Sequence, residues 1–402
     1  MRMSFFIDPP RRKDRDALEW SHNRMRFSDL VRLLPAVVLL ATSSLAVVRA
    51  PTHFLWMAAI GVMEWGHALA IICIAAAVPL ANNSWSGRVA VICCALAAML
   101  ALTPILRAGS VARELPKQLS AAFGGAAPHR PLALVYTDLF RGVSPLEVKV
   151  ERLIYSKVQD TELPLDFYRP NSAKPAPLVV AIHGGSWQSG DNKDFIGMDQ
   201  YLAGRGYAVA DIIYRLAPQW KFPAALNDTR AAIAFLRQRA DSLNIDPHRI
   251  VLLGRSAGGQ IALAVAYSAK DPGIRGVVSF YAPTDLYWSW EHPGNPLVID
   301  TKSVLSAYLG GNPSEVPSNY TAASPTRLVT SSSPPTLLIH GGRDELVSVY
   351  QSQRLAQRLR EAGVRHFNLA LPWATHGFDY ILRGPGGQIS TYAIEYFLSC
   401  VT

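Results

Sequence analysis

The sequence predicts a mostly parallel, doubly wound α/β domain, residues 146–402, preceded by three transmembrane helices. Long apolar runs almost free of charge fill much of the first quarter of the chain, and short apolar runs alternate with helical patterns after Pro177. Such alternation is typical of parallel sheets, because crossover helices join the strands and cover both faces of the sheet. The 402 residues, of which 50% are hydrophobic, suffice for one large domain and an additional module.

A charged segment, residues 1–32, comes before the apolar region, residues 33–106. The three apolar runs are Leu33–Val48, Phe54–Leu80 and Val89–Leu106. The second and third can each cross a hydrocarbon core of about 30 Å, and the first can do so if it begins near Leu30. A cleaved signal peptide followed by two helices is the alternative. The long charged segment before the first apolar run and the lack of an evident cleavage site argue against a signal peptide.

The distribution of lysine and arginine predicts the orientation of these helices. The cytoplasmic side is assigned from Arg11, Arg12, Lys13, Arg15, Arg24, Arg26 and Arg88, and the opposite side carries Arg49, Arg107, Arg113 and Lys117. Basic residues accumulate on the cytoplasmic side, so the N-terminus is expected there. Three crossings then place the α/β domain on the extracytoplasmic side of a multi-pass membrane protein, with the lipid bilayer as its surroundings.

Composition excludes several other classes of protein. The net charge of +9 includes the residues that flank the apolar runs, and no cluster of basic and aromatic residues predicts nucleic-acid binding. Three of the four cysteines, Cys73, Cys93 and Cys94, fall in apolar runs, which excludes a disulfide framework in the α/β domain. That domain must therefore be stabilised by its apolar core.

Glu64 and His67 are ionisable residues inside the second apolar run. Their spacing of three residues places them on one face of a continuous helix, where we expect them to pair with each other. The alternative is a functional site within the membrane.

Residues 107–145 are expected to link the membrane region to the α/β domain. Within this linker Leu115, Leu119 and Phe123 recur at four-residue spacing, and Gly124 follows, which predicts a helix that ends there.

The α/β domain is expected to begin with two antiparallel strands, around Val148–Tyr155 and Leu163–Phe167, because apolar residues alternate there. The strand runs that follow are Leu178–Ile182, Ala208–Tyr214, Ile250–Leu253, Val277–Tyr281, Thr336–His340 and Phe367–Leu371. Helices are expected over Phe195–Ala203, Pro223–Asp241, Ala257–Ala269, Tyr350–Ala362 and Ser390–Leu398. Ligands of such a sheet bind outside the carboxyl ends of its strands.

An insertion, residues 283–334, interrupts this alternation with aromatic residues and many prolines, glycines and serines. A long excursion between two strands usually forms a lid or a pocket wall, and a tolerated surface insertion is the alternative.

The run Ile250–Leu253 leads into Gly254-Arg255-Ser256-Ala257-Gly258-Gly259. A strand followed by a glycine-flanked serine and a helical pattern is a nucleophile elbow. Gly254 and Gly258 are expected to clear space for a strained turn at Ser256, where neighbouring Cβ atoms would collide.

A second motif, His183-Gly184-Gly185-Ser186-Trp187, follows the run Leu178–Ile182. Its backbone N–H groups are suited to binding an oxyanion. The predicted oxyanion-hole donors are Gly184, Gly185 and Ala257.

A serine nucleophile needs a base, and the base needs an orienting acid, in the chain order Ser, Asp, His. The histidines after Ser256 are His292, His340, His366 and His376. His376 is the predicted base because its loop follows the last strand, and His340 is expected to shape a turn by hydrogen bonding. Asp344, just past Thr336–His340, is the predicted acid. Its rivals are Glu345 and Asp285.

No histidine pair stands at metal-ligand spacing beside a carboxylate and no cofactor motif appears, so neither a metal nor a cofactor is expected.

From about Leu146 onward the chain resembles α/β-hydrolase-fold esterases, in the branch that includes hormone-sensitive-lipase-like esterases, feruloyl esterases and kynurenine formamidases. The resemblance is carried by the two motifs above, by Tyr214-Arg215-Leu216-Ala217-Pro218 with Phe222-Pro223-Ala224, by Asp344 and by His376-Gly377-Phe378. It implies an oxyanion loop, a structural turn, a nucleophile elbow, an acid and a base at these positions. Ser186 and Arg255 depart from the lipase-like pattern and shift the resemblance toward formamidases and feruloyl esterases.

In the structural turn, Arg215 is expected to bond a nearby carboxylate such as Asp228, and binding of an anionic substrate is the alternative. Trp187, Trp288 and Trp290 are candidate substrate-pocket residues. The sequence thus predicts a membrane-anchored serine hydrolase that acts on esters of small or medium acyl chains. An amidase or formamidase, and a non-catalytic adhesion or sensor protein on the same scaffold, are the alternatives.

Overall fold

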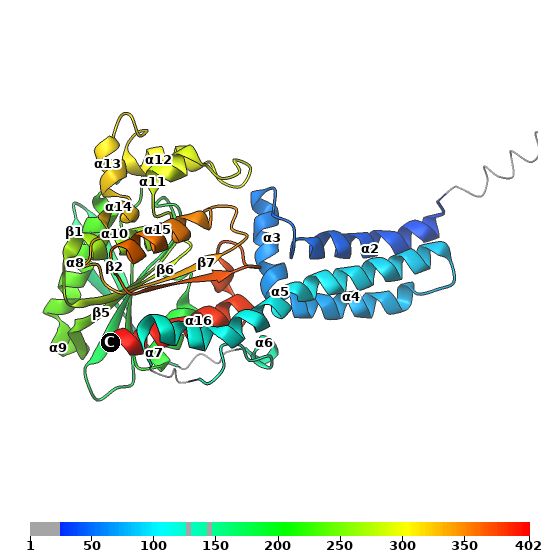
Figure 1. Cartoon of the computed structure of the whole chain (residues 1–402), viewed down its shortest axis with the longest axis horizontal. Helices are drawn as coiled ribbons and strands as arrows, with labels where there is room; N and C mark the ends of the chain where they lie inside the picture. Colours follow the sequence, from blue (N-terminus) through cyan, green and yellow to red (C-terminus); the bar gives the residue numbers. More distant parts are fainter. Residues whose placement is uncertain (1–24, 126–129, 143–146) are drawn as a thin grey trace, which may run out of the picture.

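The computed structural model of the chain describes residues 25–125, 130–142 and 147–402. An α/β domain stands at one end of a bundle of long helices (Figure 1). The charged residues 1–24, which weigh most in the predicted orientation, lie outside the described residues, as does residue 146, the predicted start of the domain.

In the described part of the chain, an eight-stranded sheet forms the centre of the α/β domain, in the order β1-β2-β4-β3-β5-β6-β7-β8. The strands are β1 (Lys149–Val158), β2 (Thr161–Arg169), β3 (Ala176–Ile182), β4 (Ala208–Ile212), β5 (Ile245–Arg255), β6 (Ile274–Phe280), β7 (Thr336–Gly341) and β8 (His366–Leu371). Strand β2 is antiparallel to both of its neighbours, β1 and β4, and the other neighbouring pairs are parallel. The predicted antiparallel entry and the parallel strands after it are confirmed.

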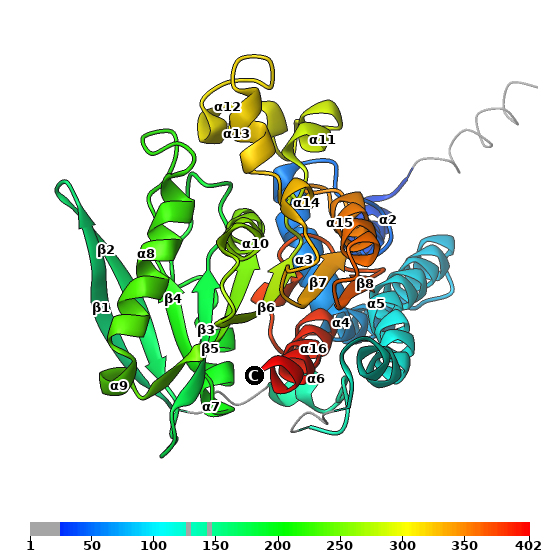
Figure 2. The same ribbon diagram turned by 60° about the vertical axis from the view of Figure 1, so that its left-hand side comes forward.

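Helices cover both faces of this sheet (Figure 2). Strand β3 shows why, because Leu178, Val180 and Ile182 are buried in one core while Val179 and Ala181 are buried in the other. The first core is covered by α8 (Ala224–Gln238), α10 (Ala257–Ala269) and α15 (Tyr350–Glu361), and the second by α7 (Ile196–Gly204) and α16 (Pro385–Val401). A strand buried on both faces has no polar side, which explains its continuous apolar sequence.

Shorter elements complete the domain. They are α6 (Asp138–Arg141), α9 (Ala240–Leu243), the insertion helices α11 (Leu286–Glu291), α12 (Thr301–Leu309), α13 (Pro317–Ala322) and α14 (Pro325–Leu328), and the 3₁₀ helix η1 (Phe378–Tyr380).

The N-terminal helices are α2 (Phe27–Ser44), α3 (His53–Glu64), α4 (Gly66–Leu80) and α5 (Trp85–Phe123). Helices α2, α4 and the first half of α5 lie side by side and point away from the α/β domain (Figure 1). Among the described residues, α2 and α5 are each long and apolar enough to cross a membrane. A third crossing results if α3 and α4 count as one bent span.

The second apolar run, predicted as one spanning helix over Phe54–Leu80, is broken at Trp65. Helices α3 and α4 meet there at an angle of 87°, so that α4 joins the bundle while α3 lies across its end, against the α/β domain (Figure 1). At Gly66 an added Cβ would lie 2.0 Å from the carbonyl oxygen of Ala101, so the start of α4 approaches α5 too closely for any side chain. Helix α4 has 15 residues. That is about 22 Å of helix, shorter than a hydrocarbon core of about 30 Å.

The predicted pairing of Glu64 with His67 is wrong. The carboxylate of Glu64 accepts a hydrogen bond from the backbone N–H of Gly386, in the first turn of α16, at 2.9 Å. The imidazole of His67 contacts the ring of Phe140 edge-on, with 4.8 Å between the ring centroids. A spacing of three residues brings side chains together only along an unbroken helix, and the bend at Trp65 separates these two.

The predicted linker, residues 107–145, begins with the second half of α5. Leu115, Leu119 and Phe123 are buried there in the second core of the α/β domain. Gly124, with φ of 95°, follows the helix, as the pattern predicted. Helix α5 therefore belongs to the bundle at one end and to the domain core at the other.

Candidate functional site

Ser256 occupies a tight turn between β5 and α10. Its φ of 53° and ψ of −119° are strained for a residue with a side chain. A Cβ on Gly254 would lie 2.1 Å from the carbonyl oxygen of Gly258, and a Cβ on Gly258 would lie 2.2 Å from that of Ile182. The prediction that these two glycines clear space for the turn is confirmed.

The loop His183–Trp187 begins at the end of β3 and lies against this turn. A Cβ on Gly184 would be 3.3 Å from the Cβ of Ser256. Gly185 has φ of 105°, and a Cβ there would lie 2.1 Å from the carbonyl oxygen of Ser189. Ala257 is the first residue of α10, where N–H groups have no acceptor within the helix. The three predicted oxyanion donors therefore lie around Ser256.

Tyr214 holds this loop in place. Its hydroxyl donates to the carbonyl oxygen of His183 at 3.2 Å, and its ring stacks on the imidazole of His183 with 4.2 Å between centroids. Burial lowers the pKa of His183, so a neutral imidazole is favoured beneath the loop.

His376 and Asp344 are brought together by the loops that follow the neighbouring strands β8 and β7. Nδ1 of His376 lies 2.7 Å from Oδ2 of Asp344. The other carboxylate oxygen accepts hydrogen bonds from the backbone N–H groups of Leu346 and Val347 at 2.9 and 2.8 Å. Burial alone would raise the pKa of Asp344, but the charge of His376 and hydrogen bonds from His340 and His376 lower it to about 2. An ionised carboxylate is thus available to orient the imidazole.

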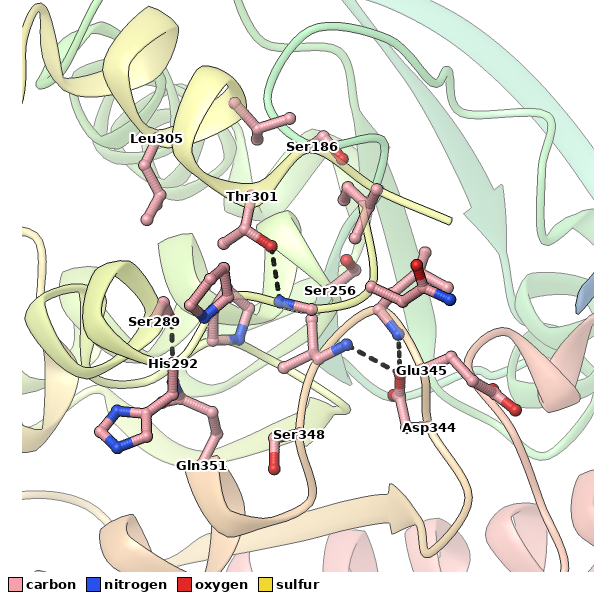
Figure 3. A pocket seen from close by; sticks show the side chains of 18 of the residues that line it. Ser186, Ser256, Ser289, His292, Thr301, Leu305, Asp344, Glu345, Ser348 and Gln351 are labelled. Carbon is pink, nitrogen blue, oxygen red and sulfur yellow. Dashed lines mark hydrogen bonds between the residues drawn. The ribbon is translucent and has the colours of Figure 1, made fainter. Parts of the chain in front are cut away.

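Two cavities border Ser256. One, of about 290 Å³, is also lined by Gly184, Gly185 and His376. The other, of about 630 Å³, includes Asp344 and residues of the insertion such as Thr301 and Leu305 of α12 (Figure 3). The insertion therefore contributes wall residues to the larger cavity.

The other histidines after Ser256 lie in different positions, although His340 also contacts Asp344, with 3.2 Å between its Nε2 and Oδ2 of the carboxylate. Nδ1 of His340 lies 2.5 Å from Oγ of Ser352, and its Nε2 lies 3.0 Å from the carbonyl oxygen of Val347. It shapes the turn after β7, as predicted. His292 is exposed in the insertion, and His366 begins β8, at the other end of that strand from the base candidate.

The rival acids also have partners of their own. Glu345 accepts a hydrogen bond from the backbone N–H of Ala50 at 2.9 Å. Asp285 caps α11 and pairs with Arg354 at 3.0 Å.

The structure brings two of the three predicted pocket tryptophans to the larger cavity. Trp187 and Trp288 both line it. Trp187 is fixed by its indole N–H, which donates to Gln260 at 2.9 Å, and by stacking on Tyr308 at 4.2 Å. Trp290 instead packs edge-on against the ring of Tyr320 at 6.2 Å and is not among the described residues that line either cavity at Ser256.

Arg215 bonds Asp228, as predicted. Its guanidinium donates to both carboxylate oxygens of Asp228, at 2.7 and 2.9 Å. This arrangement supports the structural interpretation of Arg215, because the carboxylate already pairs with its charge and accepts from two of its nitrogens.

The sequence interpretation missed a buried ion pair beside the serine. Nε of Arg255 donates to Asp379 at 2.6 Å, and the hydroxyl of Tyr281 donates to the other oxygen of Asp379 at 2.5 Å. Burial alone would lower the pKa of Arg255, but the nearby charge of Asp379 raises it. Because Arg255 precedes Ser256 and Asp379 follows His376 closely, this pair ties the serine turn to the histidine loop. The adjacency of Arg255 to the serine was its only sequence signal.

The sequence interpretation also missed wall residues from outside the α/β domain. They are Arg49, Ala50 and Pro51 in the larger cavity and His53 and Trp56 in the smaller one. The sequence indicated this role only weakly, because the first four stand between two runs interpreted as membrane helices and Trp56 stands inside the second run.

Comparison with known proteins gives several esterases among the relatives of this chain. The BD-FAE family model matches residues 165–359. Esterase LipC of Mycobacterium tuberculosis is 31% identical over 258 residues, which are 59% of this chain and 62% of that protein. The arylesterase of Saccharolobus solfataricus is 36% identical over 120 residues, 30% of this chain and 39% of that protein. The chain thus spans less than two thirds of the length of these curated relatives.

Two solved structures with a similar fold are also structures of esterases. The thermophilic esterase Est2 of Thermogutta terrifontis, with propionate bound, has a TM-score of 0.51 and 27% identity, and the match covers 61% of this chain and 91% of that one. A bacterial heroin esterase has a TM-score of 0.56 and 26% identity, over 66% of this chain and 90% of that one. The predicted α/β-hydrolase fold and the resemblance to esterases of that fold are confirmed.

Proposed function

We propose that this chain, which belongs to the α/β-hydrolase-fold esterases, is a membrane-anchored serine carboxylesterase for esters of small or medium acyl chains. The observation that carries the proposal is the hydrogen bond between His376 and Asp344 at a cavity that Ser256 borders. A serine in a strained turn, a base and an ionised acid form the arrangement that acyl transfer requires.

The proposed reaction has two steps. In the first, Oγ of Ser256 bonds to the ester carbonyl carbon while His376 takes the hydroxyl proton and Asp344 holds the imidazole in the required tautomer. The oxyanion accepts hydrogen bonds from the backbone N–H groups of Gly184 or Gly185 and of Ala257. His376 then gives the proton to the alcohol oxygen as the bond between that oxygen and the acyl carbon breaks.

In the second step, water attacks the acyl-enzyme while His376 accepts its proton. The acid leaves and the proton returns to Ser256, so the enzyme ends in its starting state.

The apolar helices support the membrane anchor. We propose three crossings, through α2, through α4 up to its bend into α3, and through the first half of α5. The α/β domain then lies on the extracytoplasmic side, opposite the N-terminus. A C-terminal alkaline phosphatase fusion is expected to be active, and activity of a fluorescent cytoplasmic reporter alone would contradict this topology.

The function is tested by turnover of a 4-nitrophenyl ester series, from acetate to octanoate, with a formyl anilide as the matched amide. We expect the full-length chain to prefer an ester, and Ser256→Ala to lower kcat/KM by at least about 10³-fold. The matched control is Ser268→Ala, at the other end of α10, where the hydroxyl bonds the carbonyl of Ala264 within its own helix. Wild-type rates in Ser256→Ala would contradict the proposal, and preference for the formyl anilide would support an amidase instead.

A further inference from the structure

Residues 49–56, which comprise the end of the connection from α2 and the first turn of α3, form part of the walls around the proposed nucleophile. The larger cavity is bordered by Arg49, Ala50 and Pro51, and the smaller one by His53 and Trp56. The α/β domain alone therefore leaves both cavities without one wall.

This segment contacts both loops that carry the acid and the base. The backbone N–H of Ala50 donates to Oε1 of Glu345 at 2.9 Å, next to Asp344. The indole N–H of Trp56 donates to the carbonyl oxygen of His376 at 3.1 Å. The membrane region is thus joined to the site through hydrogen bonds and does not serve only as a tether.

The insertion closes on the same segment. The side-chain amide of Asn295 donates to the carbonyl oxygen of Pro51 at 2.9 Å, and the backbone N–H of His53 donates to the carbonyl oxygen of Leu297 at 3.1 Å. Residues 49–56 and the insertion therefore form one continuous rim.

The outer side of this rim is apolar. Met63 of α3 is fully buried and Val62 is 6% exposed, whereas Phe54 is 73% exposed and Met57 49%. Leu297 of the insertion is 68% exposed. An apolar helix with one face buried in protein needs an apolar partner for its other face.

The placement of α3 identifies that partner as a bilayer. Helix α3 makes an angle of 87° with α4 and lies across the end of the bundle (Figure 1). A bundle that crosses the membrane therefore places α3 in the plane of the membrane surface, which is the position of an interfacial helix.

The rim also carries a basic residue, because Arg49 borders the larger cavity. Arg49 and Arg107 are exposed, and both are close enough to Arg343 to act on it. Burial lowers the pKa of Arg343, Glu345 opposes this effect, and the charges of Arg107 and Arg49 lower it further. Basic side chains at the end of a membrane span suit the anionic headgroups of lipids.

The reaction itself assigns the two parts of an ester to the two cavities. The alcohol oxygen receives its proton from His376, so the alcohol part must lie in the 290 Å³ cavity that His376 lines with His53 and Trp56. The acyl part then occupies the 630 Å³ cavity, bordered by Trp187 and Leu305.

We propose that the preferred substrates are esters of a small or medium acid with a lipophilic alcohol that is dissolved in the bilayer. The alcohol chain stays in lipid beside α3 while the ester carbonyl reaches Ser256. The inference rests on the proposed function and names the substrate class of that site.

The test compares two butyrate esters with the full-length protein in phosphatidylcholine vesicles. One is 4-nitrophenyl butyrate, added in water, and the other is hexadecyl butyrate, dissolved in the bilayer. The variant Phe54→Ser/Met57→Ser changes only side chains that line neither cavity. We expect kcat/KM for hexadecyl butyrate to fall about tenfold, with that for 4-nitrophenyl butyrate within about twofold of wild type.

Leu297→Ser, in the insertion, should lower hydrolysis of hexadecyl butyrate in the same selective way. The matched control is Val150→Ser/Ile154→Ser, which removes two apolar side chains of β1 that are each 45% exposed. This control should leave both rates unchanged.

The two proposals fail in distinguishable ways. Wild-type protein that does not hydrolyse 4-nitrophenyl butyrate would contradict the proposed function. Wild-type protein that hydrolyses only this ester, equal losses on both esters in the α3 variant, or an equal loss in the β1 control would overturn the inference about the substrate class.

Discussion

Helices α3 and α4 come from one apolar run of sequence, but they have different neighbours. Helix α3 buries Ala59 and Met63 in the core of the α/β domain. Helix α4 buries Ala70 and Cys73 in the bundle, and its exposed large apolar residues are Ile71, Ile72, Ile74 and Val78.

This difference teaches that apolar composition alone does not separate a helix that faces lipid from one that packs on protein. Polar residues separate them, because a buried polar group needs a partner that lipid does not supply. Glu64 and Trp56 find their partners in the α/β domain, at Gly386 and His376.

The largest difference in stability between variants of α3 and variants of α4 is expected for Glu64. Glu64→Ala leaves the backbone N–H of Gly386 without its acceptor at the N-terminus of α16, and should lower the free energy of unfolding by about 2–3 kcal/mol. His67→Ala, on the α4 side of the bend, removes the edge-on contact with Phe140, and should cost less than about 1 kcal/mol.

The measurement is the Tm of each variant in the same detergent. Equal shifts in Tm for the two substitutions would mean that α3 contributes no more to the stability of the α/β domain than α4 does.

A smaller effect, on turnover, is expected for Trp56. Trp56→Phe keeps an aromatic ring but removes the hydrogen bond to the carbonyl oxygen of His376. The loop that carries His376 should then be held less firmly, so kcat should fall about five- to tenfold, with KM within about twofold of the wild-type value.

Trp65→Phe is the matched control, because the ring of Trp65 lies over the guanidinium of Arg383, at 4.5 Å, and not at the site. Steady-state kinetics and Tm of both variants test the prediction. A drop in Tm of Trp56→Phe with unchanged kcat would show a purely structural role.

The smallest effect concerns the pH dependence of stability. Burial raises the pKa of Glu345 above its ordinary value of 4.5, although hydrogen bonds from Thr375 and Ala50 oppose this effect. The folded state therefore holds this proton more tightly than the unfolded state does. The corresponding stabilisation is lost as pH rises above 4.5 and through the raised pKa.

The Tm of the wild type should thus decrease relative to that of Glu345→Gln between about pH 4 and about pH 7. Parallel Tm curves over this range would mean that Glu345 titrates as it does in the unfolded chain.

The fold could be predicted where the determinants are local. Leu178–Ile182 has no polar position, so it had to lie between two apolar layers, and its residues do enter both cores. The need for glycine at positions 254 and 258 could also be predicted from local sequence, because the tight turn at Ser256 leaves no room for a Cβ at Gly254 or Gly258. The bond between Arg215 and Asp228 could be predicted because a charged residue that follows a buried strand needs a partner.

The remainder depends on contacts between distant parts of the chain. Glu64 and Gly386 are 322 positions apart, so only the nearby His67 was evident as a partner. The break at Trp65 and the wall formed by residues 49–56 arise from the same packing of α3 on the α/β domain. Trp290 could not be separated from Trp288 by composition, because the fold of the insertion decides which ring faces the cavity.

The roles of Ser256, Asp344 and His376 stay predictions, and the labelling of one hydroxyl tests them most directly. The full-length protein is treated with a fluorophosphonate, and the labelled peptide is mapped by mass spectrometry. Ser186 and Ser189, which also border the cavities, serve as internal controls. We expect label on Ser256 alone, at a rate at least about 10²-fold lower in His376→Ala. Folded wild-type protein that remains unlabelled at Ser256, or that is labelled on another serine, would contradict the account.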